Sequence, residues 1–276
     1  MQKGSEKNLK ERIDTLLVEQ GFFKSRERAK AALMEGIVFI GDERIDKAGM
    51  KVDPDSVITV KGDDCPYVSR GGYKLEKAID VFDIDLKDKT CADIGASTGG
   101  FTDCMLQNGA SKVYSIDVGY GQLDWKLRND KRVVNLERTN IRYITEEQVT
   151  DKIDFFSVDV SFISLKLVLP VVRRLMNDKA GGVCLIKPQF EAGRENVGKK
   201  GVVRDPKVHC DVVQNIVEFC VNNGFDVLGL DYSPIKGPEG NIEYLIYIEK
   251  SENPEIRTVL TPTELVSNSH KELDKK

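Results

Sequence analysis

Residues Cys91–Phe101 read CADIGASTGGF: a short apolar run, a glycine-rich turn and the start of a helix expected over 99–108. In an open parallel sheet, the turn from the first strand into the first helix lies where ligands bind. Glycines let the backbone approach a ligand closely, and the amides of the helix point outward from its first turn. This turn is therefore the first candidate binding site.

Strand-like and helix-like segments alternate after this turn. Such alternation predicts a mostly parallel sheet covered by helices on both faces, as in Rossmann-like α/β domains. The last two strands have no helix between them, so we expect them to pair antiparallel at one edge of a seven-stranded sheet. The strands are expected at 90–95, 112–117, 133–137, 153–159, 182–187, 225–232 and 243–249, and the helices include 99–108, 164–177 and 206–223.

A small α+β module precedes this domain. Apolar spacing predicts an amphipathic helix over 6–20, and Ser25 is the expected N-cap of a second helix that ends at Gly36. Short strands are expected at 37–40 and 57–60. The predicted organisation is a front module at 1–61, a linker at 62–71, an α/β domain at 72–250 and a polar, loosely ordered tail at 251–276.

The composition favours a globular protein. Of 276 residues, 40% are hydrophobic and 31% are charged, without a run of about 18 apolar residues, and the first residues are too polar for a signal peptide. Six scattered cysteines without a CxxC pair and only two histidines give no pattern for a metal site. We expect a reduced, cytoplasmic protein without a metal or a membrane partner.

The net charge of −4 hides a difference between the two parts of the chain. Residues 1–61 hold 12 Lys and Arg against 11 Asp and Glu, whereas the remaining residues hold 29 against 34. The candidate phosphate-binding residues of the front module are Arg12, Lys24, Arg26 and Arg28. The alternative is an ordinary solvated helix face. A basic loop at 199–204 is a further candidate for RNA contacts.

Three cofactors compete for the glycine-rich turn. A dinucleotide site requires G-x-G-x-x-G, and a phosphate-binding loop requires a lysine after its glycines; neither pattern is present. An acid in the first strand and Asp117 at the end of the second fit S-adenosylmethionine, because Asp117 is placed to accept the ribose hydroxyls. The candidate cofactor-binding residues are Asp93, Gly95, Ala96, Ser97, Thr98, Gly99, Phe101, Asp117 and Asp159.

The same turn also matches the G-x-S-x-G nucleophile elbow of hydrolases. Ser97, Asp159 and His209 occur in the order that such an enzyme uses. However, no segment of the HGGG type precedes the first strand to form an oxyanion hole. The hydrolase hypothesis is therefore the weaker one, and His209 is expected in the first turn of a helix that begins at Pro206.

Two lysines and two acids form a second candidate group: Lys74, Asp159, Lys187 and Glu243. Lys187 follows an apolar strand at its carboxyl end, where open α/β sheets place ligands, and Asp159 ends the neighbouring strand in the same way. Each residue alone is typical of a salt bridge at a strand end. Convergence of all four on one cleft indicates a functional site.

The whole chain resembles the haemolysin A (TlyA) family of ribosomal RNA methyltransferases, whose catalytic domain is related to FtsJ-type ribose 2′-O-methyltransferases. The front module resembles the RNA-binding S4 fold. The resemblance implies that Lys74, Asp159, Lys187 and Glu243 are catalytic and that the substrate is ribosomal RNA in ribosomal subunits, at a cytidine. It rests on RID at 12–14, KSR at 24–26, VSRG at 68–71, DIGASTGGFT at 93–102, DVSFIS at 159–164 and IKPQFE at 186–191.

The chemistry of ribose methylation requires mainly one base, because the methyl group of a sulfonium needs no acid to activate it. Lys187 is the expected base if neighbouring positive charge and burial lower its pKa, with Asp159 orienting its amine. Lys74 and Glu243 would set the local field and hold the ribose. Two alternatives stay open: a membrane-active haemolysin, and an RNA-binding protein with an inert methyltransferase domain.

Overall fold

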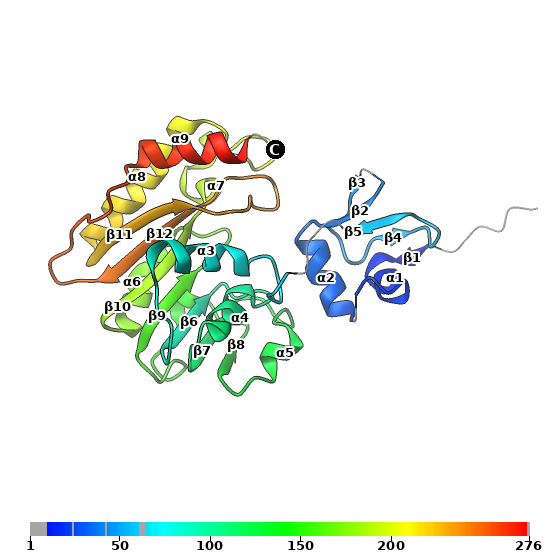
Figure 1. The fold of residues 1–276 in the computed structure, drawn as a ribbon, viewed down its shortest axis with the longest axis horizontal. Coiled ribbons are helices and arrows are strands. Elements are labelled where there is room, and N and C mark those ends of the chain that lie inside the picture. The colour runs from blue at the N-terminus through cyan, green and yellow to red at the C-terminus, as the bar shows by residue number, and fades with distance from the viewer. Residues whose placement is uncertain (1–9, 24, 42, 61–64, 275–276) are drawn as a thin grey trace, which may run out of the picture. The chain divides into compact units, whose positions relative to one another are not determined.

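The computed structural model describes residues 10–23, 25–41, 43–60 and 65–274. Contacts divide the chain into two compact units, Met1–Ser69 and Arg70–Lys276 (Figure 1). Each unit has its own hydrophobic core, and the two are described separately below.

The first unit is a small α+β fold. The buried side chains of Ile13, Leu17 and Leu33 join its two helices to the strands. The hydroxyl of Ser25 accepts a hydrogen bond from the Arg28 amide, which confirms the predicted N-cap. The elements are β1 (Glu11–Arg12), α1 (Ile13–Glu19), α2 (Arg26–Met34), β2 (Val38–Ile40), β3 (Glu43–Arg44), β4 (Lys51–Val52) and β5 (Ile58–Val60), with antiparallel sheets β3-β2-β5 and β1-β4.

The second unit contains a seven-stranded sheet in the order β11-β12-β10-β9-β6-β7-β8. Strands β6 to β10 run parallel, whereas β12 runs antiparallel to both β10 and β11. The mostly parallel sheet and the antiparallel pair of the last two strands are thus confirmed. The strands are β6 (Thr90–Ile94), β7 (Lys112–Ile116), β8 (Val133–Leu136), β9 (Ile153–Val158), β10 (Met176–Ile186), β11 (Phe225–Tyr232) and β12 (Tyr244–Lys250).

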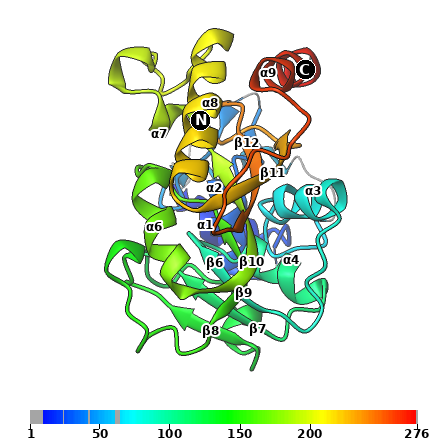
Figure 2. The same cartoon turned by 90° about the vertical axis from the view of Figure 1, so that its left-hand side faces the viewer.

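Helices cover both faces of this sheet (Figure 2). The helices α3 (Gly72–Phe82) and α4 (Gly100–Gln107) lie on one face, and α6 (Leu165–Leu175) and α8 (Pro206–Asn222) lie on the other. The main core lies beneath α6 and α8, where apolar side chains of every strand from β6 to β12 except β8 are buried. Three-residue and four-residue helices complete the unit: α5 (Trp125–Arg128), η1 (Ile141–Tyr143), α7 (Pro188–Glu191) and η2 (Arg194–Asn196).

The tail after residue 250 differs from the loosely ordered segment that we expected. It contains the helix α9 (Pro262–Leu273), which packs on α8 and β11. Thr261 and Glu264 form a capping box at its start, and Leu265 and Val266 are fully buried. The composition of the tail is polar because only one narrow stripe of this helix faces the core.

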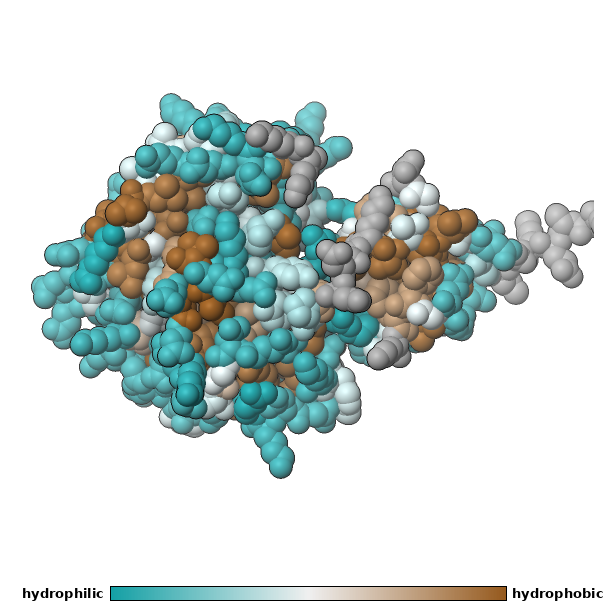
Figure 3. All heavy atoms as spheres, viewed as in Figure 1, coloured by the Kyte–Doolittle hydropathy of each residue, from teal (hydrophilic) through white to brown (hydrophobic). Residues whose placement is uncertain are grey.

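Hydrophobic side chains on the visible face of the second unit form separate areas between hydrophilic ones (Figure 3). Among the described residues, every helix is either too short or too polar to cross a membrane.

Candidate active site

The candidate catalytic residues meet at the carboxyl edge of the sheet. Asp159 follows β9 and Lys187 follows β10, so both side chains begin where these parallel strands end. Glu243 precedes β12, which runs in the opposite direction and pairs Tyr244 with Ile186. The reversed strand therefore brings Glu243 to the same edge. Lys74 reaches this edge from the first turn of α3.

The four side chains form one connected cluster. Lys74 Nζ donates hydrogen bonds to Glu243 Oε2 at 2.6 Å and to Asp159 Oδ2 at 3.4 Å. Lys187 Nζ forms an ion pair with the other carboxylate oxygen of Asp159 and lies 3.5 Å from Ser161 Oγ. Asp159 thus bridges the two lysines, and the structure brings together all four residues that the sequence pattern singled out.

Burial and charge act in opposite directions in this cluster. Lys74 is 7% exposed and Glu243 is 1% exposed. Burial alone would lower the pKa of Lys74, but the charges of Asp159 and Glu243 outweigh it and raise that pKa. Burial alone would raise the pKa of Asp159, but the charges of Lys187 and Lys74 outweigh it and lower that pKa. Lys74 and Asp159 are therefore both charged at neutral pH.

The glycine-rich turn packs directly against this cluster. Gly95 has φ +86°, and a Cβ atom at this position would lie 2.3 Å from the carbonyl oxygen of Asp159. The amide of Asp159 in turn donates to the carbonyl of Ile94 at 2.9 Å. Only glycine fits between β6 and the segment after β9, so the turn and the catalytic candidates share one backbone contact.

Asp93 supports the turn from below. It is fully buried and accepts hydrogen bonds from the amide and hydroxyl of Thr102 and from the hydroxyl of Ser157. Burial raises the pKa of Asp93 to about 7. Phe101 is also buried, at 4% exposure, so neither side chain faces solvent. Both residues shape the turn rather than line its open side.

Asp117 lies at the open side of the turn, directly after β7. Its Oδ2 accepts the Ser97 amide at 2.8 Å and its Oδ1 accepts the Gly119 amide at 2.6 Å. The carboxylate is only partly buried, and each oxygen keeps a lone pair for a further donor. Ser97 and Thr98, which are also partly buried, add hydroxyl groups near this carboxylate in the same turn.

His209 is not placed to act as the histidine of a hydrolase triad with Ser97. It is buried in the first turn of α8, where its Nδ1 lies 2.6 Å from the Tyr244 hydroxyl and its Nε2 lies 3.0 Å from the Val203 carbonyl. Both ring nitrogens are therefore engaged away from Ser97. Asp159, the expected third member, contacts lysines instead. No cluster of three metal-ligating side chains occurs among the described residues.

The candidate RNA-binding residues of the first unit have structural partners. Arg12 and Arg26 both contact the buried carboxylate of Asp14, at 2.9 and 2.8 Å, and keep 46% and 48% of their side chains exposed. The Arg28 guanidinium donates to the carbonyl of Val68. Lys24 lies outside the described residues. The exposed guanidinium edges of Arg12 and Arg26 are thus held in fixed positions.

An aromatic pair formed by the exposed Phe162 and the partly buried Phe190 was missed by the sequence analysis. Phe162 is 90% exposed with φ +64°, and its ring centroid lies 5.0 Å from that of Phe190. Both rings line a cavity of about 500 Å³ together with Arg142 and Arg194. Lys187 Nζ lies 6.0 Å from the Phe190 ring centroid, so this cavity adjoins the cluster. Apolar periodicity cannot distinguish an exposed phenylalanine from a core residue.

Known proteins share both units. Residues 11–58 match the S4 domain, and residues 67–250 match the FtsJ-like methyltransferase family. The chain is 52% identical over 275 residues to "Putative rRNA methyltransferase YqxC" of Bacillus subtilis, which covers 97% of this chain and 96% of that protein. It is 42% identical over 238 residues to "16S/23S rRNA (cytidine-2'-O)-methyltransferase TlyA" of Mycobacterium tuberculosis, which covers 86% and 89%.

A solved structure agrees with this relationship. "Putative hemolysin from Streptococcus thermophilus" superposes with a TM-score of 0.78 at 48% identity and covers 97% of this chain and 98% of that chain. The resemblance identified from sequence motifs is confirmed over both units. The chain belongs to the TlyA family of ribosomal RNA methyltransferases, in which an S4 domain precedes an FtsJ-like, S-adenosylmethionine-dependent methyltransferase domain.

Proposed function

We propose that this protein transfers a methyl group to the 2′-oxygen of a cytidine ribose in ribosomal RNA. The observation that carries the proposal is the buried cluster of Lys74, Asp159, Lys187 and Glu243 beside a glycine-rich turn. The name of the relative from Mycobacterium tuberculosis supports the choice of reaction and nucleoside.

The cofactor would be held by the turn between β6 and α4. Asp117 is placed to accept the ribose hydroxyls, and the backbone at Gly95 with the hydroxyls of Ser97 and Thr98 would hold the methionine part. When bound there, S-adenosylmethionine supplies an electrophilic methyl group that needs no acid for its transfer. Asp93 acts indirectly by fixing the start of α4 through Thr102.

The proposed base is the amine of Lys187 in its neutral form, which takes the proton from the ribose hydroxyl. Asp159 fixes the Lys187 amine by their ion pair and also shares its charge with Lys74. Lys74 stays charged between Asp159 and Glu243. The Asp159 carboxylate therefore keeps one ammonium partner when Lys187 is neutral. Lys74 and Glu243 would thereby set the local field and position the ribose.

RNA would be held by charge and by stacking. The exposed edges of Arg12 and Arg26, with Arg28 and Lys24, would contact phosphates, which supply affinity without reading sequence. RNA bases outside a duplex stack on aromatic side chains, and the exposed ring of Phe162 beside the cluster offers such a face.

The test is transfer of labelled methyl from S-adenosylmethionine to purified ribosomal subunits that lack the modification, assayed separately for each subunit. Nuclease digestion and mass spectrometry then identify the modified nucleoside. We expect 2′-O-methylcytidine with the wild type and a loss of at least about 100-fold with Lys187→Met. Binding of S-adenosylmethionine by calorimetry should be unchanged in this variant.

The control is Lys131→Ala, which removes an exposed lysine between α5 and β8. It should transfer methyl groups at the wild-type rate. Unaltered turnover with Lys187→Met would eliminate Lys187 as the base. A wild-type protein that binds the cofactor and RNA but transfers no methyl group would instead have an inert methyltransferase domain.

A further inference from the structure

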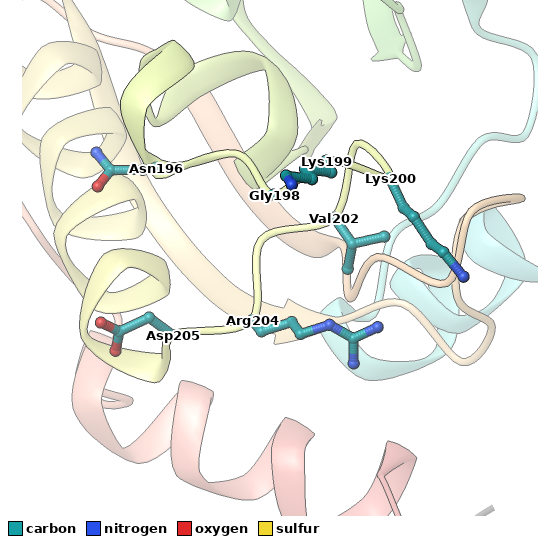
Figure 4. A pocket seen from close by; sticks show the side chains of 7 residues that line it. All are labelled: Asn196, Gly198, Lys199, Lys200, Val202, Arg204 and Asp205. Carbon is teal, nitrogen blue, oxygen red and sulfur yellow. The ribbon is translucent and has the colours of Figure 1, made fainter.

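A basic pocket lies in the segment that joins η2 to α8 (Figure 4). Its volume is about 360 Å³, and its lining includes Lys199, Lys200 and Arg204. All three cations are exposed to solvent. This accumulation of positive charge runs against the balance of residues 62–276, which hold 29 Lys and Arg against 34 Asp and Glu.

The cations of this pocket are available to an external anion. Among the ion pairs of the described residues, none involves Lys199, Lys200 or Arg204. The nearby carboxylate of Asp205 accepts the Lys207 amide at 2.9 Å and caps α8. Figure 4 shows Lys200 and Arg204 extending to one side of the loop, whereas Asn196 and Asp205 lie on the other.

The loop that carries these cations is held by internal hydrogen bonds. The Gly198 amide donates to the Val202 carbonyl at 3.1 Å, and the Gly201 amide donates to the Gly198 carbonyl at 2.8 Å. These two bonds close a tight turn with Lys199 and Lys200 at its tip. The cationic groups therefore project from a defined backbone rather than from an extended segment.

The same loop is tied to the catalytic cluster through Asn241. This side chain, 2% exposed, donates to the Gly201 carbonyl at 2.9 Å and accepts the Val203 amide at 3.0 Å. Asn241 precedes Glu243 by two residues, and Glu243 contacts Lys74. The position of the basic pocket is thereby fixed relative to the cluster by buried polar contacts.

We infer that this pocket binds a backbone phosphate of the ribosomal RNA substrate and sets the position of the strand relative to Lys187. No aromatic side chain lines the pocket, and Val202 is its one apolar side chain, so it has no platform for stacking a base. Lysine binds phosphate as a point charge and arginine as a fork of donors, which suits contact with the RNA backbone without base reading. The inference rests on the proposed methyl transfer to RNA.

The experiment compares full-length Lys199→Ala/Lys200→Ala and Arg204→Ala with a matched control, Lys87→Ala/Lys131→Ala. Both control lysines are exposed and precede β6 and β8, at the amino edge of the sheet. Transfer kinetics are measured on unmodified ribosomal subunits, and RNA affinity is measured separately by filter binding at several salt concentrations. Binding of S-adenosylmethionine is measured by calorimetry.

We expect the double variant at the pocket to raise KM for RNA about 10-fold and to lower the slope of log affinity against log salt by about 1 to 2. Its affinity for S-adenosylmethionine should match that of the wild type, whereas its kcat should fall, because the strand is held less well in position relative to Lys187. The control double variant removes the same charge, so its KM and salt slope should change much less. Equal changes in both double variants would overturn the inference, because they would reflect net charge alone.

Failure of the inference is distinguishable from failure of the proposed function. If the wild type transfers methyl groups and the pocket variants behave like the control, the proposed reaction stands and the pocket has no role in it. If the wild type transfers no methyl group but the pocket variants alone lose salt-dependent affinity for RNA, the pocket remains an RNA contact and the proposed reaction is wrong.

Discussion

Lys74 Nζ lies 2.6 Å from Glu243 Oε2, in a buried ion pair that joins α3 to the segment before β12. The two residues are 169 positions apart in the chain. Lys74 also contacts Asp159, whereas Glu243 is 1% exposed. Removal of Glu243 therefore leaves Lys74 with Asp159 as a partner, whereas removal of Lys74 leaves the buried Glu243 carboxylate without this ammonium group.

Lys74→Met should destabilise the second unit by about 3 to 5 kcal/mol, because the buried Glu243 carboxylate loses the ammonium that neutralises it. Lys74→Met/Glu243→Gln should cost clearly less than the sum of the two single variants, since the isolated charge is also removed. Urea unfolding of the four proteins completes a double-mutant cycle. Additive free energies of unfolding would show that the ion pair contributes no coupling.

Gly95→Ala should lower the affinity for S-adenosylmethionine at least about 10-fold, because its Cβ atom would displace the Asp159 carbonyl or the turn itself. Gly121→Ala is the matched control in the same unit. Gly121 has φ +71°, and a Cβ atom added there would meet no atom within 4 Å, so it shares the backbone strain without the collision. Calorimetry on both variants decides whether strain or contact matters, and equal affinities would contradict the role of the contact.

Asp14→Asn should weaken RNA binding about 3- to 10-fold, although it makes the protein more positive by one charge. The reason is that Asp14 holds Arg12 and Arg26 in place. Glu19→Gln makes the same change of charge at an exposed position of α1. If both variants bind RNA more tightly than the wild type in a salt-dependent assay, net charge rather than the placement of the two arginines controls affinity.

His209 should make stability depend on pH in mildly acidic solution. Burial lowers its pKa below the usual value of 6.5, against the opposing effect of the Val203 hydrogen bond; the His270 ring also lowers it, and the charges of Asp274 and Asp205 raise it. The unfolded chain then takes up a proton first as the pH falls, so stability is present above pH 6.5 and is lost as the pH drops towards the folded pKa.

The slope of this loss is at most about 1.4 kcal/mol per pH unit for one proton. His209→Gln should be less stable at pH 7.5 but should lose less stability between pH 7 and 5, as measured by urea unfolding. His270→Gln controls for the other histidine of the chain. An unchanged pH slope in His209→Gln would show that His209 is not the titrating group.

Leu265→Ala should destabilise the second unit by about 2 to 5 kcal/mol, because Leu265 is fully buried in the main core. Val259→Ala should change stability by less than about 0.5 kcal/mol, since Val259 is 97% exposed. Thermal unfolding compares the two. A small effect of Leu265→Ala would mean that α9 does not contribute to the core.

The order of strands and helices was predictable because their periodicities differ and because glycine and proline mark the turns. The start of β10 was not. Residues 164–177 were expected to be helical throughout, yet α6 ends at Leu175 and the strand begins at Met176. Local sequence does not show this change, because pairing of Met176 with Ile153 on β9 decides it. The helix α9 had a readable signal, the capping box at Thr261 and Glu264.

The side chains of the cluster were identified because parallel strands expose their carboxyl ends at one edge. Three other features required coordinates. The packing of Gly95 on the Asp159 carbonyl depends on the spacing of two strands that are distant in the chain. The ties of Arg12 and Arg26 to Asp14 and the exposure of Phe162 depend on tertiary contacts. Tertiary contacts of this kind produce no periodic pattern of apolar residues that could be recognised in the sequence.

The placement of β12 has a consequence for biogenesis. It is the last strand along the described chain, yet it lies inside the sheet between β10 and β11, and β11 has no other strand neighbour there. During synthesis from the amino end, the earlier strands can assemble while β10 keeps an open edge and Lys74 lacks Glu243. Arrival of β12 joins β11 to β10 and brings Glu243 beside Lys74, so a nascent chain shorter than about 250 residues lacks both the complete sheet and the complete cluster.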